Sequence, residues 1–266
     1  MSALRTLVLL CALVADGAWP AAAVAAAPSE GPLPPLPTGS GFARLPVPGF
    51  LPAVVAWPPD AASRPLPVVV ALHGSYDQPE WNCEVYRQVV RGAAVVLCPR
   101  GRLRWDSPTD PRQLRFYFPS TGGWIFREVD AALRALKESA PTRIADGPVV
   151  YAGFSQGAIL AVPSLPARGE QFSRAILVEG GASWSTSNAR AYAKSGGQRV
   201  LFACGRAGCF TRARATAATL EQAGLKTKVT YTPDQGHTYD GGVQRDLMQS
   251  FAWLVEDDAR FVLPAQ

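Results

Sequence analysis

A serine enclosed by two glycines is the residue in this sequence best suited to act as a nucleophile. Ser155 lies in the pentapeptide Gly153-Phe154-Ser155-Gln156-Gly157, which follows an apolar segment and precedes a segment of helical character. A strand, a tight turn and a helix in succession expose the serine hydroxyl on a strained backbone, and the glycines avoid Cβ collisions with the strand and the helix. We therefore predict a nucleophile at Ser155; an ordinary glycine turn is the alternative interpretation.

A serine hydroxyl needs a neighbouring base at neutral pH, and histidine is the usual one. The chain contains only His73 and His237. His237 follows the last predicted strand, on a loop with a glycine hinge at Gly236, and we assign it as the base. His73 precedes Gly74 at the end of an early strand, where we expect it to orient its own loop.

An acyl-transfer site also needs two donors for a developing oxyanion. The helix N-terminus that follows Ser155 supplies one candidate, the backbone N–H of Gln156. The loop after His73-Gly74 supplies the other, from Ser75 or Tyr76. We predict Gln156 and Ser75, with Tyr76 left open as the alternative to Ser75.

The elements that must position these residues alternate in type along the chain. Continuous apolar segments are typical of strands buried on both faces, so the pattern predicts an α/β fold with a mostly parallel sheet and helices on both faces. In such sheets ligands bind beyond the carboxyl ends of the strands, where Ser155, His237 and His73 all lie. No insertion is long enough for a large cap domain. The predicted strands are 67–72, 93–98, 148–152, 174–178, 199–203 and 226–231, and the predicted helices are 81–91, 124–139, 156–162, 188–194, 211–223 and 243–255.

Three further segments have a different character. Residues 28–41 are rich in proline, glycine and serine, which predicts an extended linker before a single domain at 42–266. Segments 42–48 and 51–57 have an alternating, strand-like pattern, and both segments contain prolines, so we expect two short edge strands. Residues 102–121 have no clear periodicity but several aromatic side chains, which favours a long functional loop bordering the site.

The N-terminus has the pattern of a secretory signal peptide. Arg5 precedes the apolar residues 7–14 and the alanine-rich residues 21–27, and the apolar run is too short to span a bilayer. We predict a signal peptide at 1–27, cleaved near Ala26 or Ala27, and hence a secreted or periplasmic protein. An N-terminal membrane anchor is the alternative.

Removal of the signal peptide leaves four cysteines, an even number in an exported chain, which favours disulfides. Cys204 and Cys209 are close in sequence and bracket a short loop, so we pair them, and Cys83 then pairs with Cys98. A metal site is the competing interpretation, but two histidines and the absence of a Cys-x-x-Cys motif argue against it.

Composition excludes several classes of function. The chain has 266 residues, 48% of them hydrophobic, and a net charge of +5 that is spread along the chain. A clustered basic face is typical of nucleic-acid binding, and none is apparent. We expect no cofactor, no metal, no nucleic acid and no stable membrane insertion, but a small-molecule acyl substrate; the oligomeric state stays open.

The strand-His73-Gly74 segment, the Gly-Phe-Ser-Gln-Gly pentapeptide and the late Gly236-His237 together resemble the α/β-hydrolases. Gly-Phe-Ser-Gln-Gly in particular is similar to small carboxylesterases and acyl-protein thioesterases. The resemblance in strand order covers about residues 50–255. It implies an α/β-hydrolase fold and the hydrolysis of an ester or thioester through an acyl-enzyme.

One departure from that family concerns the acid that orients the histidine. The family usually carries an aspartate after the next-to-last strand, where this chain has Gly208 and no carboxylate before Glu221. We favour Glu179, which follows the strand after the nucleophile helix and is flanked by glycines, because an orienting group must reach the base. Asp234 and Asp240 near His237, or no acid at all, are the alternatives.

The sequence therefore predicts a secreted, carboxylesterase-like serine hydrolase with Ser155, His237 and Glu179 as catalytic residues. A peptidase on the same fold is one alternative. A non-catalytic, hydrolase-like binding protein is another, because the usual aspartate is missing.

Overall fold

The computed structural model describes residues 33–39, 41–59 and 64–264. The predicted signal peptide at 1–27 lies outside these residues, as does part of the predicted linker at 28–41. Within them no helix is both long enough and apolar enough to cross a bilayer.

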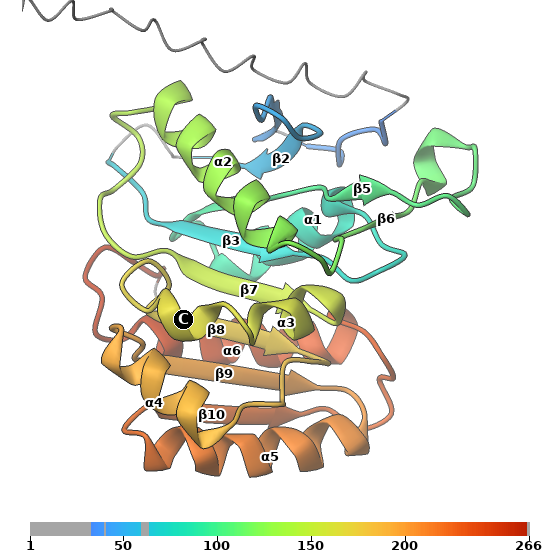
Figure 1. Ribbon diagram of the computed structural model, residues 1–266. Helices are drawn as coiled ribbons and strands as arrows, with labels where there is room; N and C mark the ends of the chain where they lie inside the picture. Colours follow the sequence, from blue (N-terminus) through green and yellow to red (C-terminus); the bar gives the residue numbers. More distant parts are fainter. Residues whose placement is uncertain (1–32, 40, 60–63, 265–266) are drawn as a thin grey trace, which may run out of the picture.

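A mixed sheet of eight strands forms the centre of the described part of the chain (Figure 1). The strand order is β1-β2-β4-β3-β7-β8-β9-β10; the pairs from β4 to β10 are parallel, and β2 is antiparallel to both β1 and β4. The strands are β1 (Phe42–Leu45), β2 (Ala53–Ala56), β3 (Val68–Leu72), β4 (Val95–Cys98), β7 (Val150–Phe154), β8 (Arg174–Val178), β9 (Arg199–Cys204) and β10 (Lys226–Tyr231). The prediction of a mostly parallel sheet is thus confirmed.

Helices cover both faces of this sheet, as predicted. In Figure 1, α2 and α3 lie in front of the sheet and α6 lies behind it. Strand β3 shows why its sequence is continuously apolar: Val68 and Val70 pack into the core on one face, and Val69 packs into the core on the other. The helices are α1 (Pro79–Val90), α2 (Trp124–Ser139), α3 (Gln156–Ala161), α4 (Thr186–Lys194), α5 (Ala207–Gln222) and α6 (Gly241–Val255).

Three sequence-based expectations need correction. The segment 51–57 is not an edge strand, because β2 pairs with β1 and with β4; prolines flank the strand and leave its ladder intact. The helix expected from residue 211 begins at Ala207. The segment 102–121 contains a small hairpin of β5 (Arg102–Leu103) and β6 (Phe116–Tyr117), with a 3-10 turn, η1 (Pro111–Gln113), between them. Its strands are too short to produce a periodic pattern.

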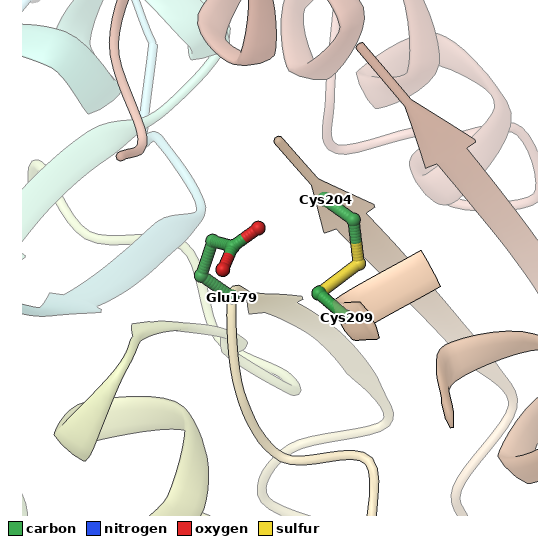
Figure 2. Close-up of side chains that lie close together, drawn as sticks. All are labelled: Glu179, Cys204 and Cys209. Atoms are coloured by element: carbon green, nitrogen blue, oxygen red, sulfur yellow. A yellow bond between two sulfur atoms is a disulfide. The ribbon is translucent and has the colours of Figure 1, made fainter. Parts of the chain in front are cut away.

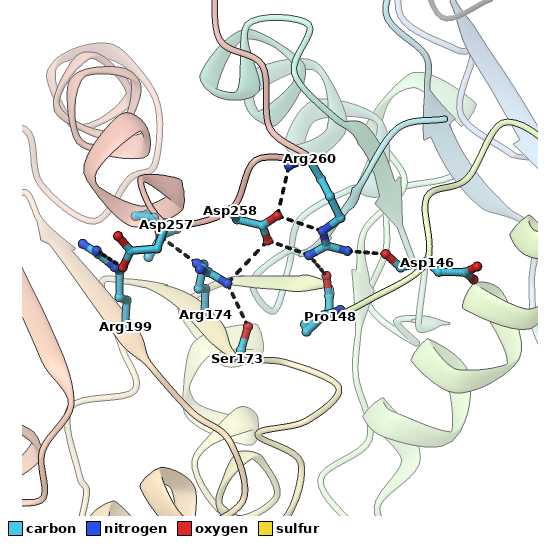
Figure 3. A network of polar contacts seen from close by, with 9 residues as sticks. Asp146, Pro148, Ser173, Arg174, Arg199, Asp257, Asp258 and Arg260 are labelled. Atoms are coloured by element: carbon cyan, nitrogen blue, oxygen red, sulfur yellow. Dashed lines mark hydrogen bonds and ion pairs between the residues drawn. The ribbon is translucent and has the colours of Figure 1, made fainter. Parts of the chain in front are cut away.

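An ionic network fastens the end of α6 to the amino ends of the strands (Figure 3). Arg199 at the start of β9 pairs with Asp257, and Arg174 at the start of β8 lies 3.5 Å from Asp258. Arg260 binds Asp258 at 2.6 Å and donates to two backbone carbonyls that precede β7. This network lies at the opposite end of the strands from the predicted catalytic residues, so it serves the fold.

Candidate active site

Ser155 occupies the tight turn between β7 and α3. Its backbone has φ 48° and ψ −108°, a conformation that a residue with a side chain rarely adopts. A Cβ on Gly153 would lie 2.6 Å from the carbonyl carbon of Gly157, and a Cβ on Gly157 would lie 2.6 Å from the Leu72 carbonyl oxygen. The two glycines are therefore required by close backbone approach, as the sequence predicts.

His237 meets the serine from the loop after β10. Its Nε2 lies 2.8 Å from Ser155 Oγ, and its ring packs against Phe154 with centroids 5.0 Å apart. The imidazole remains 39% exposed, which leaves one side of the pair open to a substrate. A base is thus within hydrogen-bond reach of the hydroxyl.

Glu179 meets the other ring nitrogen of the same histidine. Its Oε2 lies 3.0 Å from His237 Nδ1, and its side chain is fully buried. With Nδ1 protonated, His237 donates to Glu179 and its Nε2 accepts from the Ser155 hydroxyl. Glu179 follows β8 and has φ 50°, a further strained backbone at this site.

The Glu179 carboxylate is held by the loop that follows β9. Its Oε1 accepts the backbone N–H groups of Gly205 at 2.7 Å and of Arg206 at 3.0 Å, and its Oε2 accepts Arg206 Nε at 2.6 Å. Burial alone would raise the pKa of Glu179, but the hydrogen bonds from His237, Gly205 and Arg206 outweigh it and hold the pKa below its usual value. The acid is therefore ionised and fixed in orientation.

A disulfide closes the loop that binds this carboxylate. Figure 2 shows Glu179 beside Cys204 and Cys209, whose sulfurs are bonded to each other and whose Cα atoms lie 5.6 Å apart. Cys83 and Cys98 form the second disulfide, with a Cα separation of 5.8 Å, so the predicted pairing is found. Glu179, Cys204 and Cys209 have the spacing of a metal cluster, but the sulfurs are committed to the disulfide and the carboxylate to its donors.

The two other candidate acids lie elsewhere. Asp240 accepts the Thr238 hydroxyl and directly precedes α6, and Asp234 is exposed and has a backbone φ of 60°. Among the described residues, Glu179 is the carboxylate hydrogen-bonded to His237.

The predicted oxyanion donors flank the serine. Gln156 begins α3, so its backbone N–H is one of the first-turn groups that lack a partner within the helix. The loop after β3 is adjacent, because a Cβ on Gly74 would lie 3.2 Å from Ser155 Cβ. The Tyr76 N–H is bonded to the Phe116 carbonyl at 3.0 Å, whereas the Ser75 N–H has no partner in the described part of the chain, which favours Ser75.

Several residues that position the site carry no signal in the sequence, because their contacts are long-range. The buried Asp77 accepts the Gly74 and Gln78 N–H groups, and the Tyr239 hydroxyl lies 3.2 Å from the same carboxylate. The loop after β3 is thereby joined to the loop that carries His237. His73 is buried with its ring nitrogens 2.7 Å and 2.9 Å from two backbone carbonyls, in keeping with the predicted structural role.

A cleft of about 280 Å³ contains the Ser155 and His237 side chains. Residues 102–121 do not line this cleft. They border the site as expected: the Phe116 carbonyl accepts the Tyr76 N–H of the loop after β3 at 3.0 Å, and the Phe118 N–H donates to the Gln156 side chain at the start of α3 at 2.8 Å. The residues that line the cleft are Ser155, Ile159, Glu179, Gly180, Gly181, Ala182, Ser183, Arg206, Cys209, Arg212 and His237.

Comparison with known proteins defines the fold. No protein-family model matches the sequence, and no curated protein matches it at a significant level. An S-formylglutathione hydrolase from Agrobacterium tumefaciens aligns with 83% of this chain and 94% of its own, at 17% identity and a TM-score of 0.56. Est1E from Butyrivibrio proteoclasticus aligns with 82% of this chain and 100% of its own, at 13% identity and a TM-score of 0.54. A thermostable esterase aligns with 77% of this chain at 18% identity and a TM-score of 0.51, and the match spans 58% of that esterase.

The chain therefore has the α/β-hydrolase fold, and the fold that the sequence resemblance implies is confirmed. At these identities the likeness defines the architecture alone. The chemistry has to be argued from the residues at the carboxyl edge of the sheet.

Proposed function

We propose that this protein is a serine hydrolase that cleaves an ester or thioester through an acyl-enzyme formed on Ser155. One observation carries the proposal: a single imidazole lies 2.8 Å from the Ser155 hydroxyl and 3.0 Å from the buried Glu179 carboxylate. Nucleophile, base and orienting acid in this order are the arrangement by which a serine becomes reactive.

In the first half of the reaction, Ser155 Oγ attacks the acyl carbon and its proton passes to His237 Nε2. The N–H groups of Gln156 and Ser75 bind the negative oxygen of the tetrahedral intermediate. Glu179 stabilises the imidazolium without taking its proton. The imidazolium then protonates the leaving alkoxide or thiolate, and the acyl group stays on the serine.

In the second half, His237 removes a proton from water, and the resulting hydroxide attacks the acyl-enzyme. The tetrahedral intermediate collapses, the acid product leaves, and the Ser155 oxygen regains its proton from His237. The half-exposed imidazole and the open cleft are compatible with the entry of this water.

The place of action that we propose is outside the cytoplasm, in the medium or the periplasm. The signal pattern at 1–27 and the two disulfides support export, because disulfides persist in oxidising compartments. N-terminal sequencing of protein recovered after export should find a start near residue 27 or 28; recovery with residues 1–27 intact in a membrane fraction would favour an anchor.

A fluorophosphonate probe tests the proposed chemistry directly. Wild-type protein should be labelled and should hydrolyse short acyl esters, and Ser155→Ala should abolish both. Equal labelling of the variant, or no labelling of a folded wild type, would contradict the proposal and favour a binding protein. Parallel assays of short acyl esters, thioesters and peptide amides rank the leaving groups and test the peptidase alternative.

A further inference from the structure

The start of α5 forms one wall of the cleft, and two arginines lie on this wall. Arg206 and Arg212 both line the cleft that contains Ser155 and His237. Apart from Glu179 and His237, the remaining lining residues are small, apolar or hydroxyl-bearing. Glu179 is thus the one carboxylate among eleven lining residues.

That carboxylate does not neutralise both arginines. Glu179 is already bound to His237, to two backbone N–H groups and to Arg206 Nε. Arg212 makes no hydrogen bond and no ion pair with any residue that the structure describes. The wall therefore has an excess of positive charge, and the guanidinium of Arg212 has all its donors available.

The shape of this wall leaves the guanidinium accessible from the cleft. Arg212 Nη1 would lie 3.5 Å from a Cβ on Gly208, so the side chain extends back along α5 toward the helix start. Gly208 has no side chain to cover it. Gly180, Gly181 and Ala182 are equally small on the neighbouring loop, and they leave room for a substrate group beside the arginine.

We infer that the substrate of this site carries an anionic group, such as a carboxylate, close to the scissile ester, and that Arg212 binds it. A guanidinium pairs with a carboxylate through parallel N–H···O bonds, and such a pair is stronger than a neutral hydrogen bond. The inference rests on the proposed hydrolase function and narrows its substrate class to esters that carry an anionic group. Arg212 acts as a specificity-determining residue, whereas Arg206 belongs to the contacts that hold Glu179.

Matched esters that differ only in charge test this inference. On the acyl side, monoethyl esters of the dicarboxylic acids from succinic to suberic are compared with the same ethyl esters in which the free carboxylate is a carboxamide. On the alcohol side, the butyrate ester of glycolic acid is compared with that of glycolamide. In each pair a carboxylate is replaced by a carboxamide of the same shape.

We expect kcat/KM to favour the carboxylate by on the order of tenfold or more in at least one pair, as a hydrogen bond to a charged group provides. Arg212→Gln should reduce that preference to about twofold or less, because it lowers kcat/KM for the carboxylate partner more than for the neutral partner. Arg214→Gln is the control: it removes the same charge from the same helix, but its guanidinium lies over the Phe210 ring and outside the cleft. The control should keep the full preference.

Each other outcome has a defined meaning. Turnover of both partners at equal rates, or a preference that survives Arg212→Gln, would overturn the inference while leaving the hydrolase proposal intact. A preference lost equally in Arg214→Gln would also overturn it, because net charge would then be the cause. Wild-type protein that turns over neither partner of any pair and resists the fluorophosphonate probe would remove the proposed function, and the inference with it.

Discussion

Glu179 and His237 are hydrogen-bonded across a sequence separation of 58 residues. Glu179 follows β8, whereas the α/β-hydrolases that the sequence resembles usually carry this acid one strand later. The loop after β9, where that aspartate would stand, contributes backbone N–H groups and a guanidinium that hold the displaced carboxylate. A glutamate side chain is longer than an aspartate side chain and bridges the additional distance. The relationship between acid and imidazole is thus kept, while the strand that supplies the acid differs.

The first prediction concerns this acid. Glu179→Gln should lower kcat by roughly 10⁴-fold, because an amide cannot hold His237 in the required tautomer or stabilise its protonated form. Steady-state kinetics on a short acyl ester measure the loss. Asp234→Asn, an exposed carboxylate on the His237 loop, is the control and should be nearly neutral. A large loss in Asp234→Asn, with normal turnover by Glu179→Gln, would assign the acid to Asp234.

The second prediction separates the two disulfides. Replacement of Cys204 and Cys209 by serine should lower the free energy of unfolding by about 2 kcal/mol and also reduce kcat, since these cysteines close the loop that binds Glu179. Replacement of Cys83 and Cys98 should cost about 3 kcal/mol of stability but leave kcat unchanged. Urea unfolding and kinetics of both variants test the difference; equal kcat values would show that the loop holds Glu179 without its disulfide.

The third prediction concerns pH and stability. Burial raises the pKa of Glu128 from 4.5 to about 7, although the Arg100 and Gly101 N–H groups and the Trp124 indole donate to it. Between these two pH values the folded state retains a proton that the unfolded state has released, so this group makes stability fall as pH rises from about 4.5 to about 7.

The size of this effect is roughly 3 kcal/mol, from the free energy equivalent of one pKa unit. Glu128→Gln should remove it, so that the variant gains stability relative to the wild type as the pH rises through this window. Urea denaturation at several pH values measures the difference between the two proteins. A constant difference across the window would mean that Glu128 stays ionised in the folded protein.

The fourth prediction concerns the ionic network at the amino ends of the strands (Figure 3). Asp258→Asn removes the carboxylate that faces Arg174 and Arg260, and should lower the free energy of unfolding by about 3 kcal/mol because the buried Arg174 loses the carboxylate of its ion pair. Catalysis should be unaffected, since the network lies at the far end of the strands. Thermal unfolding and kcat together check this; a large fall in kcat at a temperature where the variant remains folded would contradict it.

Much of the fold was predictable from the sequence because it depends on local pattern. The strand at Arg174–Val178 and the helix at Trp124–Ser139 have the predicted bounds, since continuous apolar runs and helical spacing are strong signals. The strands β5 and β6 were not predicted because two residues are too few to establish a period.

The candidate site divides in the same way. Ser155 was identifiable because its turn has a sequence signature, and His237 because histidine is scarce in this chain. Arg206, Asp77 and Tyr239 were not identifiable, because each acts through a contact with a residue far away in the sequence. The choice between Glu179 and Asp234 depended on the path of their loops in space, which could not be read from the sequence. The hydrogen bond between Glu179 and His237 favours Glu179.

The strained backbone at Glu179 has a consequence for how pseudoenzymes are recognised. A search for the nucleophile, the histidine and an aspartate after the penultimate strand would class this chain as a hydrolase that has lost its activity. A carboxylate nonetheless lies within hydrogen-bond distance of the imidazole, on a residue that follows the adjacent strand and has a left-handed backbone conformation. Chains that lack the aspartate are better judged by whether any acidic side chain can reach the histidine ring nitrogen that faces away from the serine.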